Sequence, residues 1–273
     1  MTVARRIYRP AEKALESYAI RMFFNIQPTP YDVRFRVLGI PVCIHPSYWL
    51  VSALFAWSLA KLGIQFWFIG IGCMFLSLMV HELGHALMFR YYGVASVIFL
   101  YSFGGLAIPE GRVPKRSQRI IVALAGPTAN FLLAGLVWGS NYIEPWTVNL
   151  YALVIFSILF SINLYWGLLN LLPVWPLDGG QVARELFQKY NSRDGLVKSL
   201  QLSVAVAIAF VIYALACEFE LIPLEFISSL FRPGIFAAVI FAMLAFQNYT
   251  ELQNTRRMPG FSRQDDDDRP PWR

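Results

Sequence analysis

The sequence predicts an all-α polytopic membrane protein with about six transmembrane helices and a short membrane-associated β-hairpin or loop after the second helix. Two observations lead to this prediction. Hydrophobic residues make up 57% of the chain and charged residues 15%, a balance that a soluble domain of 273 residues would struggle to keep in solution. The hydrophobic residues also form continuous runs near the ~20 residues that a spanning helix needs, whereas the strands of a β-barrel alternate between two faces.

Six apolar runs are long enough to be candidate spans, and the first and fifth are the shortest. They cover residues 46–63, 66–92, 118–139, 148–172, 199–217 and 228–248. We expect them to form one membrane-embedded domain over residues 37–250. A cytoplasmic segment over 1–36 would precede this domain, and a short disordered tail over 251–273 would follow it.

The positions of the basic residues predict the orientation of the chain. Lysine and arginine are concentrated in the N-terminal segment, in the tail and in the loops of one side, and only Lys61 and Arg232 fall on the other side. The positive-inside rule then places both termini in the cytoplasm of a multi-pass protein, which we expect in the cell membrane. The net charge of +6 follows from this asymmetry. It therefore indicates contact with anionic membrane lipid and no nucleic-acid partner.

The N-terminal segment has apolar residues at helical spacing over 11–23, directly after three arginines. This pattern suits a helix that lies in the cytoplasmic interface of the membrane. A surface helix packed on a neighbouring cytoplasmic loop explains it equally well.

The second apolar run contains MVHELGHALM at residues 79–88. An ionisable side chain inside a bilayer costs about 2.5 kcal/mol or more, so its presence there points to function. His81 and His85 are one helical turn apart and can offer two imidazoles to one ion, with Glu82 beside them. This is the HExxH arrangement in which zinc hydrolases hold the metal with the histidines and use the glutamate as a base. The alternative is that the histidines bond neighbouring helices and Glu82 pairs with an arginine.

A catalytic zinc needs a third protein ligand and an open position. The sequence offers His45, before the first span, and Asp178, in the segment LLNLLPVWPLDGGQVARELF at 168–187. Two prolines break the helix there, and Gly179 with Gly180 would permit a turn. We interpret His45 as a structural histidine. Asp178 is either a metal ligand or the N-cap of the following helix.

Several motifs occur together in one order and spacing. They are GIPVCIHPSYW (39–49), HELGH (81–85), YSFGG (101–105), AGPTAN (125–130) and NLLPVWPLDGG (170–180). With them the chain resembles the site-2 protease family of intramembrane zinc metalloproteases over roughly residues 37–190. The resemblance is to the compact type of this family, without a PDZ domain or a cystathionine-synthase-like domain.

The resemblance implies that His81, His85 and Asp178 ligate one Zn²⁺ per chain and that Glu82 is the catalytic base. It also implies substrates. Family members cut single-span transmembrane proteins within or beside the bilayer, often to release a regulator, which is regulated intramembrane proteolysis.

Four further residues are candidates for substrate binding. Asn130 lies inside the third span, where its amide either holds extended substrate backbone or joins two helices. Gly104 and Gly105 suggest a hairpin whose edge pairs with an unwound substrate strand, or a plain cytoplasmic turn. Asn170 either orients a water or substrate carbonyl or caps the broken helix.

Two other classes of protein remain as alternatives. Six spans with intramembrane histidine and aspartate would suit a metal transporter, but a transporter needs polar residues through both halves of the bilayer, and the outer half of each span is apolar. A catalytically inactive membrane scaffold of the same fold would usually lack Glu82 or a ligand, and all of these residues are present.

Overall fold

The structure is a computed structural model that describes residues 29–102, 104–143, 149–189, 192–220 and 233–257. The predicted interfacial helix at 11–23 and the chain beyond residue 257 lie outside these residues. Residue contacts divide the chain into two compact units, Met1–Gly167 and Leu168–Arg273. The membrane domain expected over 37–250 includes parts of both units, and its boundaries stay a prediction.

Five helices in the described ranges are long and apolar enough to cross a membrane, which makes this a multi-pass membrane protein. They are α4 (Ile64–Tyr91), α5 (Arg116–Ser140), α6 (Leu150–Asn170), α8 (Ser192–Glu218) and α9 (Ile235–Arg257). The chain is thus mostly helical, as the sequence predicts, but it also contains a small sheet that is larger than the one expected hairpin or loop. The expected number of six spans is not confirmed.

The first predicted span, at 46–63, is not one continuous α-helix. Helix α3 (Pro46–Phe55) has 10 residues and is followed by the 3₁₀ helix η1 (Ala56–Leu62) of 7 residues. Ten α-helical residues extend for about 15 Å, which is half of a typical hydrocarbon core. Apolar composition alone therefore made this segment look like a span.

The sheet of the first unit has four strands in the order β1-β2-β3-β4. Strands β1 (Val33–Val37) and β2 (Ile40–Ile44) form one antiparallel hairpin, and β3 (Ser96–Tyr101) and β4 (Gly104–Pro109) form another. The hairpin predicted after the second span is therefore present, and β2 pairs with β3 in parallel. Leu38 and Gly39 both have positive φ, as the tight turn between two paired strands requires.

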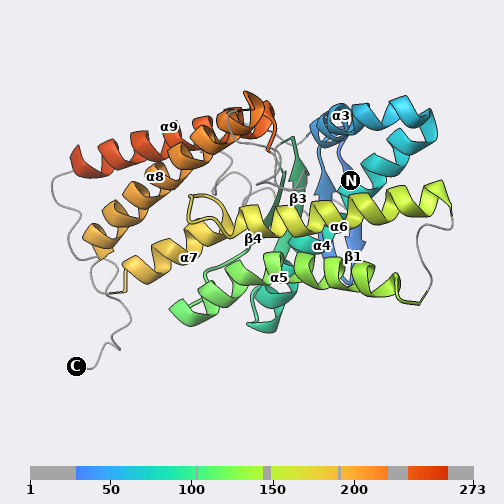
Figure 1. Cartoon of the computed structure of the whole chain (residues 1–273). Helices are drawn as coiled ribbons and strands as arrows, with labels where there is room; N and C mark the ends of the chain where they lie inside the picture. Colours follow the sequence, from blue (N-terminus) through green and yellow to red (C-terminus); the bar gives the residue numbers. More distant parts are fainter. Residues whose placement is uncertain (1–28, 103, 144–148, 190–191, 221–232, 258–273) are drawn as a thin grey trace. The chain divides into compact units, whose positions relative to one another are not determined.

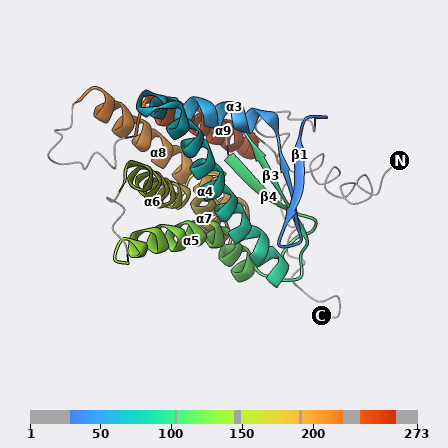
Figure 2. The ribbon, with the colours of Figure 1, turned by 90° about the vertical axis from the view of Figure 1, so that its right-hand side faces the viewer.

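Helix α4 packs against this sheet, because apolar side chains of β2, β3 and α4 share one buried cluster that includes Val42, Ile98 and Leu78. Helices α5 and α6 pack on α4 further along, around Cys73, Val137 and Leu159. Figure 2 shows the two strand pairs of this unit beside α4. Helix α4 is consequently held between the sheet and two other helices.

The second unit contains α7 (Asp178–Phe187), α8 and α9 (Figure 1). Helices α8 and α9 pack along each other, with the rings of Phe210 and Phe241 stacked at a centroid distance of 4.0 Å. Helix α9 extends to Arg257, beyond the predicted end at residue 248. No glycine or proline interrupts it there, and its polar residues Asn248 and Glu251 have hydrogen-bond partners in this unit.

Candidate metal centre

His81 and His85 lie one turn apart on α4 with 3% and 8% of their surfaces exposed. Their Nε2 atoms are 3.1 Å apart. Two nitrogens that bind one tetrahedral zinc at 2.0–2.1 Å are separated by about 3.3 Å. The two imidazoles therefore already have the spacing of two ligands of one ion.

Both Nδ1 atoms face oxygen acceptors on α5. Nδ1 of His81 is 2.5 Å from Oδ1 of Asn130, and Nδ1 of His85 is 2.7 Å from the carbonyl oxygen of Val122. A backbone carbonyl can only accept a hydrogen bond, so His85 must carry its proton on Nδ1. In both rings the Nε2 lone pair is then available for a metal, as in sites where the second nitrogen of a ligating histidine is fixed by a partner.

The orientation of the Asn130 amide is determined by its other end. Nδ2 of Asn130 donates to Oδ1 of Asn163 at 2.6 Å and to the carbonyl oxygen of Ser77 at 3.2 Å. Nδ2 of Asn163 in turn donates to Oγ of Ser77 and to the carbonyl oxygen of Leu159. Both amides are completely buried. This chain of hydrogen bonds leaves Oδ1 of Asn130 as the acceptor that faces His81.

Asn163 is a residue that the sequence reasoning missed. It lies inside the predicted span at 148–172, so the rule that intramembrane polar residues need an explanation applies to it as it does to Asn130. That rule was the available signal. The structure shows that Asn130 joins helices, since its amide bonds Ser77 on α4 and Asn163 on α6. Its role in holding substrate backbone stays a prediction.

Gly126 on α5 was also missed. A Cβ atom at this position would lie 2.2 Å from Nε2 of His85 and 2.8 Å from Nε2 of His81, closer than real Cβ contacts. On α4, a Cβ atom at Gly84 would lie 2.5 Å from the carbonyl oxygen of Ala125. The two glycines thus allow α4 and α5 to approach closely and leave room for the imidazoles.

Glu82 is 3% exposed and lies against strand β4. A Cβ atom at Gly105 would be 2.5 Å from both Cγ and Oε1 of Glu82. Burial, with a smaller effect of the Glu82 charge, raises the pKa of nearby Tyr101 to about 12. The role of Glu82 as a base stays a prediction.

Asp178 is the first residue of α7 and is 5% exposed. The N-cap is Leu177, so the interpretation of Asp178 as the N-cap is wrong. Its Oδ1 accepts a hydrogen bond from Nε2 of Gln181 at 3.3 Å. The N-terminus of a helix attracts negative charge, and a carboxylate is a common metal ligand.

Gly179 and Gly180 do not form the turn that was expected, because both lie inside the first turn of α7. A Cβ atom at either would come within 2.4 Å of the backbone of the preceding loop, at Leu171 and Val174. The glycines are therefore required for close packing of this helix on its own entry loop.

The remaining candidates lie at element ends. Gly104 begins β4 with φ +140°, a conformation open to glycine, and Asn170 is the buried last residue of α6. Nothing in these positions tests their proposed roles in substrate binding. Nδ1 of His45 accepts a hydrogen bond from the Ser47 amide and caps α3.

The donor set fits zinc. Two imidazoles present paired Nε2 atoms, Gly126 leaves space beside them, and the chain offers one more buried candidate ligand in Asp178. Two histidines and one carboxylate are a ligand set of catalytic zinc sites.

Comparison with known families gives a match to Peptidase family M50 over residues 69–146 and 143–214, more than half of the chain. A zinc metalloprotease of Methanocaldococcus jannaschii is 28% identical over 178 residues, which are 64% of this chain and 50% of that protein. The putative zinc metalloprotease Rip3 of Mycobacterium tuberculosis is 36% identical over 55% of this chain and 42% of its own length. The chain thus spans about half the length of these relatives.

Two further similarities cover more of the chain. Stage IV sporulation protein FB of Bacillus subtilis is 28% identical over 79% of this chain and 67% of its own length. The solved structure of the site-2 protease from Methanocaldococcus jannaschii is 23% identical, with a TM-score of 0.53, and covers 81% of this chain and 95% of the solved chain. This second likeness shows a common fold.

Proposed function

Since the chain belongs to peptidase family M50, the site-2 protease family, we propose that it is an intramembrane zinc endopeptidase that hydrolyses peptide bonds of transmembrane proteins within or beside the bilayer. One observation is the main support for this proposal. The Nε2 atoms of His81 and His85 converge to 3.1 Å while both Nδ1 atoms bond acceptors on α5. Such a pair inside a membrane helix is costly unless it binds something.

In this proposal His81, His85 and Asp178 hold one Zn²⁺ per chain. Asp178 is favoured as the third ligand because it is a buried carboxylate, and the motif around it resembles that of the site-2 proteases. Bound zinc would polarise the scissile carbonyl, stabilise the oxyanion and lower the pKa of water.

Glu82 then acts as the general base. Its carboxylate takes a proton from the attacking water and delivers it to the leaving amine nitrogen, so that one group serves both steps. Its burial against Gly105 supports this role, because only a residue without a side chain leaves room on β4 for the Glu82 carboxylate, which is thereby held in one place.

We further propose that the substrates are single-span transmembrane proteins whose helix unwinds near the site, as in regulated intramembrane proteolysis. In the described sheet β4 pairs only with β3 and so lies at the edge. An extended substrate segment could add to this edge by backbone hydrogen bonds, with Gly104 and Gly105 opposite it. The proposed partners are thus these substrates and membrane lipid, without nucleic acid. The proposed location is the cell membrane, with both termini in the cytoplasm.

A metal transporter and an inactive scaffold are the alternatives, and one substitution separates them from a protease. In purified protein, Glu82→Gln keeps the shape of the side chain but removes the proton acceptor. Zinc should stay bound, while cleavage of a panel of single-span proteins in liposomes should fall by about 10²–10⁴-fold. Glu110→Gln, on an exposed residue after β4, is the matched control and should be fully active.

The outcomes exclude one another. Zinc flux without cleavage in wild type would indicate a transporter, and zinc binding without cleavage or flux would indicate a scaffold. Full activity of Glu82→Gln would remove Glu82 as the base.

A further inference from the structure

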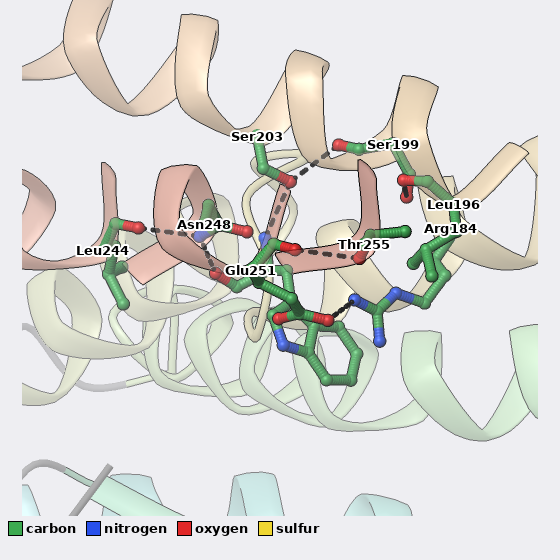
Figure 3. A network of polar contacts seen from close by, with 9 residues as sticks. Arg184, Leu196, Ser199, Ser203, Leu244, Asn248, Glu251 and Thr255 are labelled. Carbon is green, nitrogen blue, oxygen red and sulfur yellow. Dashed lines mark hydrogen bonds and ion pairs between the residues drawn. The ribbon is translucent and has the colours of Figure 1, made fainter. Parts of the chain in front are cut away.

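The loop before Asp178 is held by side chains of two membrane helices. The amide of Trp175 donates to Oγ of Ser203 on α8 at 3.1 Å, and the same hydroxyl lies 3.2 Å from the carbonyl oxygen of Pro173. The carbonyl oxygen of Trp175 accepts a hydrogen bond from Nδ2 of Asn248 on α9 at 2.6 Å. Both backbone groups of Trp175 are therefore bound, each by a different helix. Figure 3 shows Ser203 and Asn248 on these two helices.

The side chain of Trp175 is held as well. The guanidinium of Arg184, on α7, lies 3.8 Å from the centroid of a Trp175 ring. Its Nη2 atom is 2.8 Å from Oε1 of Glu251 on α9, and Figure 3 draws this ion pair. Arg184 thus connects α7, the loop and α9.

Ser203 and Asn248 are polar residues buried in membrane helices, and such residues are usually there for a structural or functional reason. Ser203 is 2% and Asn248 1% exposed, and both belong to helices apolar enough to cross a membrane. Irregular backbone at membrane depth is tolerated where protein groups satisfy its hydrogen bonds. Ser203 and Asn248 supply those bonds at one residue, three positions before Asp178.

We propose that Ser203, Asn248, Arg184 and Glu251 form a clamp that positions the metal ligand Asp178, an inference that rests on the proposed function. None of the four touches the metal in this proposal, so they are positioning residues.

Trp175, which the clamp holds, lies only three positions before Asp178, and this segment is closely packed. Gly179 and Gly180 bring the start of α7 against the backbone of Leu171 and Val174, so the loop and the first turn of α7 pack as one piece. A displaced Trp175 would therefore displace Asp178 with it. Metal ligands tolerate errors of about 0.2 Å in their distances, so a small displacement is enough to weaken binding.

The test measures the Zn²⁺ affinity of the purified full chain in detergent by competition with a chelator. Asn248→Ala and Ser203→Ala should each bind Zn²⁺ about 10-fold more weakly, the lower end of the 10–100-fold range for groups behind a ligand. Each has a control on its own helix that removes only a bond within the helix. The first control is Thr250→Ala, because the Thr250 hydroxyl donates to the carbonyl oxygen of Phe246. The second is Ser199→Ala, because the Ser199 hydroxyl donates to the carbonyl oxygen of Leu196. The controls should bind Zn²⁺ as wild type does.

A second measurement asks whether the clamp acts through Asp178. In an Asp178→Asn background, adding Asn248→Ala should change Zn²⁺ affinity little, since the ligand that the clamp positions is already impaired. A general loss of stability would instead weaken binding equally in both backgrounds. The absorption spectrum of the Co²⁺-loaded protein should change in Asn248→Ala, because it reports the geometry of the ligands.

Wild-type affinity in both Asn248→Ala and Ser203→Ala would overturn the clamp. Equal effects in the two backgrounds would overturn it too. Glu251→Gln replaces Asn248→Ala if that variant fails to fold. It keeps the shape of the side chain but loses the charge that pairs with Arg184, and it should also weaken Zn²⁺ binding; wild-type affinity would overturn the clamp. A wild-type chain that binds no Zn²⁺ would refute the proposed function instead, and that result is distinct from all of these.

Discussion

At the scale of single residues, the chemistry of the two imidazoles depends on groups that never contact a metal. Asn163 fixes the amide of Asn130, and Asn130 presents an acceptor to His81. The three side chains lie on three helices, and all are buried. A buried polar network with unsatisfied members is less stable than an apolar core. Removal of Asn163, its outermost member, should therefore disturb the orientation of His81.

Asn163→Leu tests this expectation, because leucine has a similar size but cannot accept the hydrogen bond that Nδ2 of Asn130 donates. The Asn130 amide then keeps only the Ser77 carbonyl as a restraint, and Zn²⁺ affinity should fall about tenfold. Chelator competition on the purified protein measures it. Ser157→Ala, which removes an exposed hydroxyl on the same helix, should have no effect. Unchanged affinity in Asn163→Leu would show that Ser77 alone orients Asn130.

The third ligand can be tested at the same scale. Asp178→Ala should lower the zinc content and abolish cleavage. His45→Ala should leave both nearly intact and reduce the free energy of unfolding by about 1 kcal/mol, because it removes the cap of α3. Zinc analysis and thermal unfolding measure the two effects. If zinc binding requires His45 and not Asp178, the proposed site is wrong.

At the scale of elements, the approach of α4 to α5 decides whether two histidines can share an ion. Gly84 lies where a Cβ atom would meet the backbone of Ala125, and Gly126 lies where one would meet both imidazoles. The motif AGPTAN thus places small residues beside the histidines on a facing helix, which is the usual way for membrane helices to pack closely.

Gly126→Ala should therefore abolish or strongly weaken Zn²⁺ binding, since the added methyl group occupies the position of the imidazole nitrogens. Gly135→Ala is a control on the same helix, where no described atom lies within 4 Å of the added Cβ. It should bind Zn²⁺ normally. Binding of Zn²⁺ by Gly126→Ala with wild-type affinity would mean that α5 can move away from α4 at little cost.

At the scale of the whole molecule, the described chain consists of two compact units with five helices that can cross a membrane. Composition and family membership agree on a multi-pass membrane protein. The charge asymmetry adds an expectation about its sidedness, since nearly all lysines and arginines fall in segments that would share one side.

Labelling with a membrane-impermeant thiol reagent tests that sidedness, in a background where the native cysteines are replaced. Cysteines introduced near Arg116, in the segment 173–198 and in the C-terminal tail should react only from the cytoplasmic side. A cysteine near Glu220 should react only from the outer side. Reaction of the first three from outside would reverse the predicted topology.

The sequence by itself determined the membrane class, most of the helices and the helical spacing of His81 and His85, while it left a hairpin or a plain turn open after the second span. All of these follow from local patterns, because hydropathy and helical period are properties of neighbouring residues. It misjudged the segment 46–63, where composition was apolar but the helix is broken.

Tertiary structure alone decided what surrounds the histidines. Asn130 is 49 residues from His81 and Asn163 a further 33 residues on, so no local pattern could pair them. The same holds for Gly126 beside the imidazoles, Gly105 beside Glu82, and Asn248, 73 residues from Trp175. Contacts between helices depend on which faces meet. Only the folded chain specifies those faces, because several packings can bury the same apolar runs equally well.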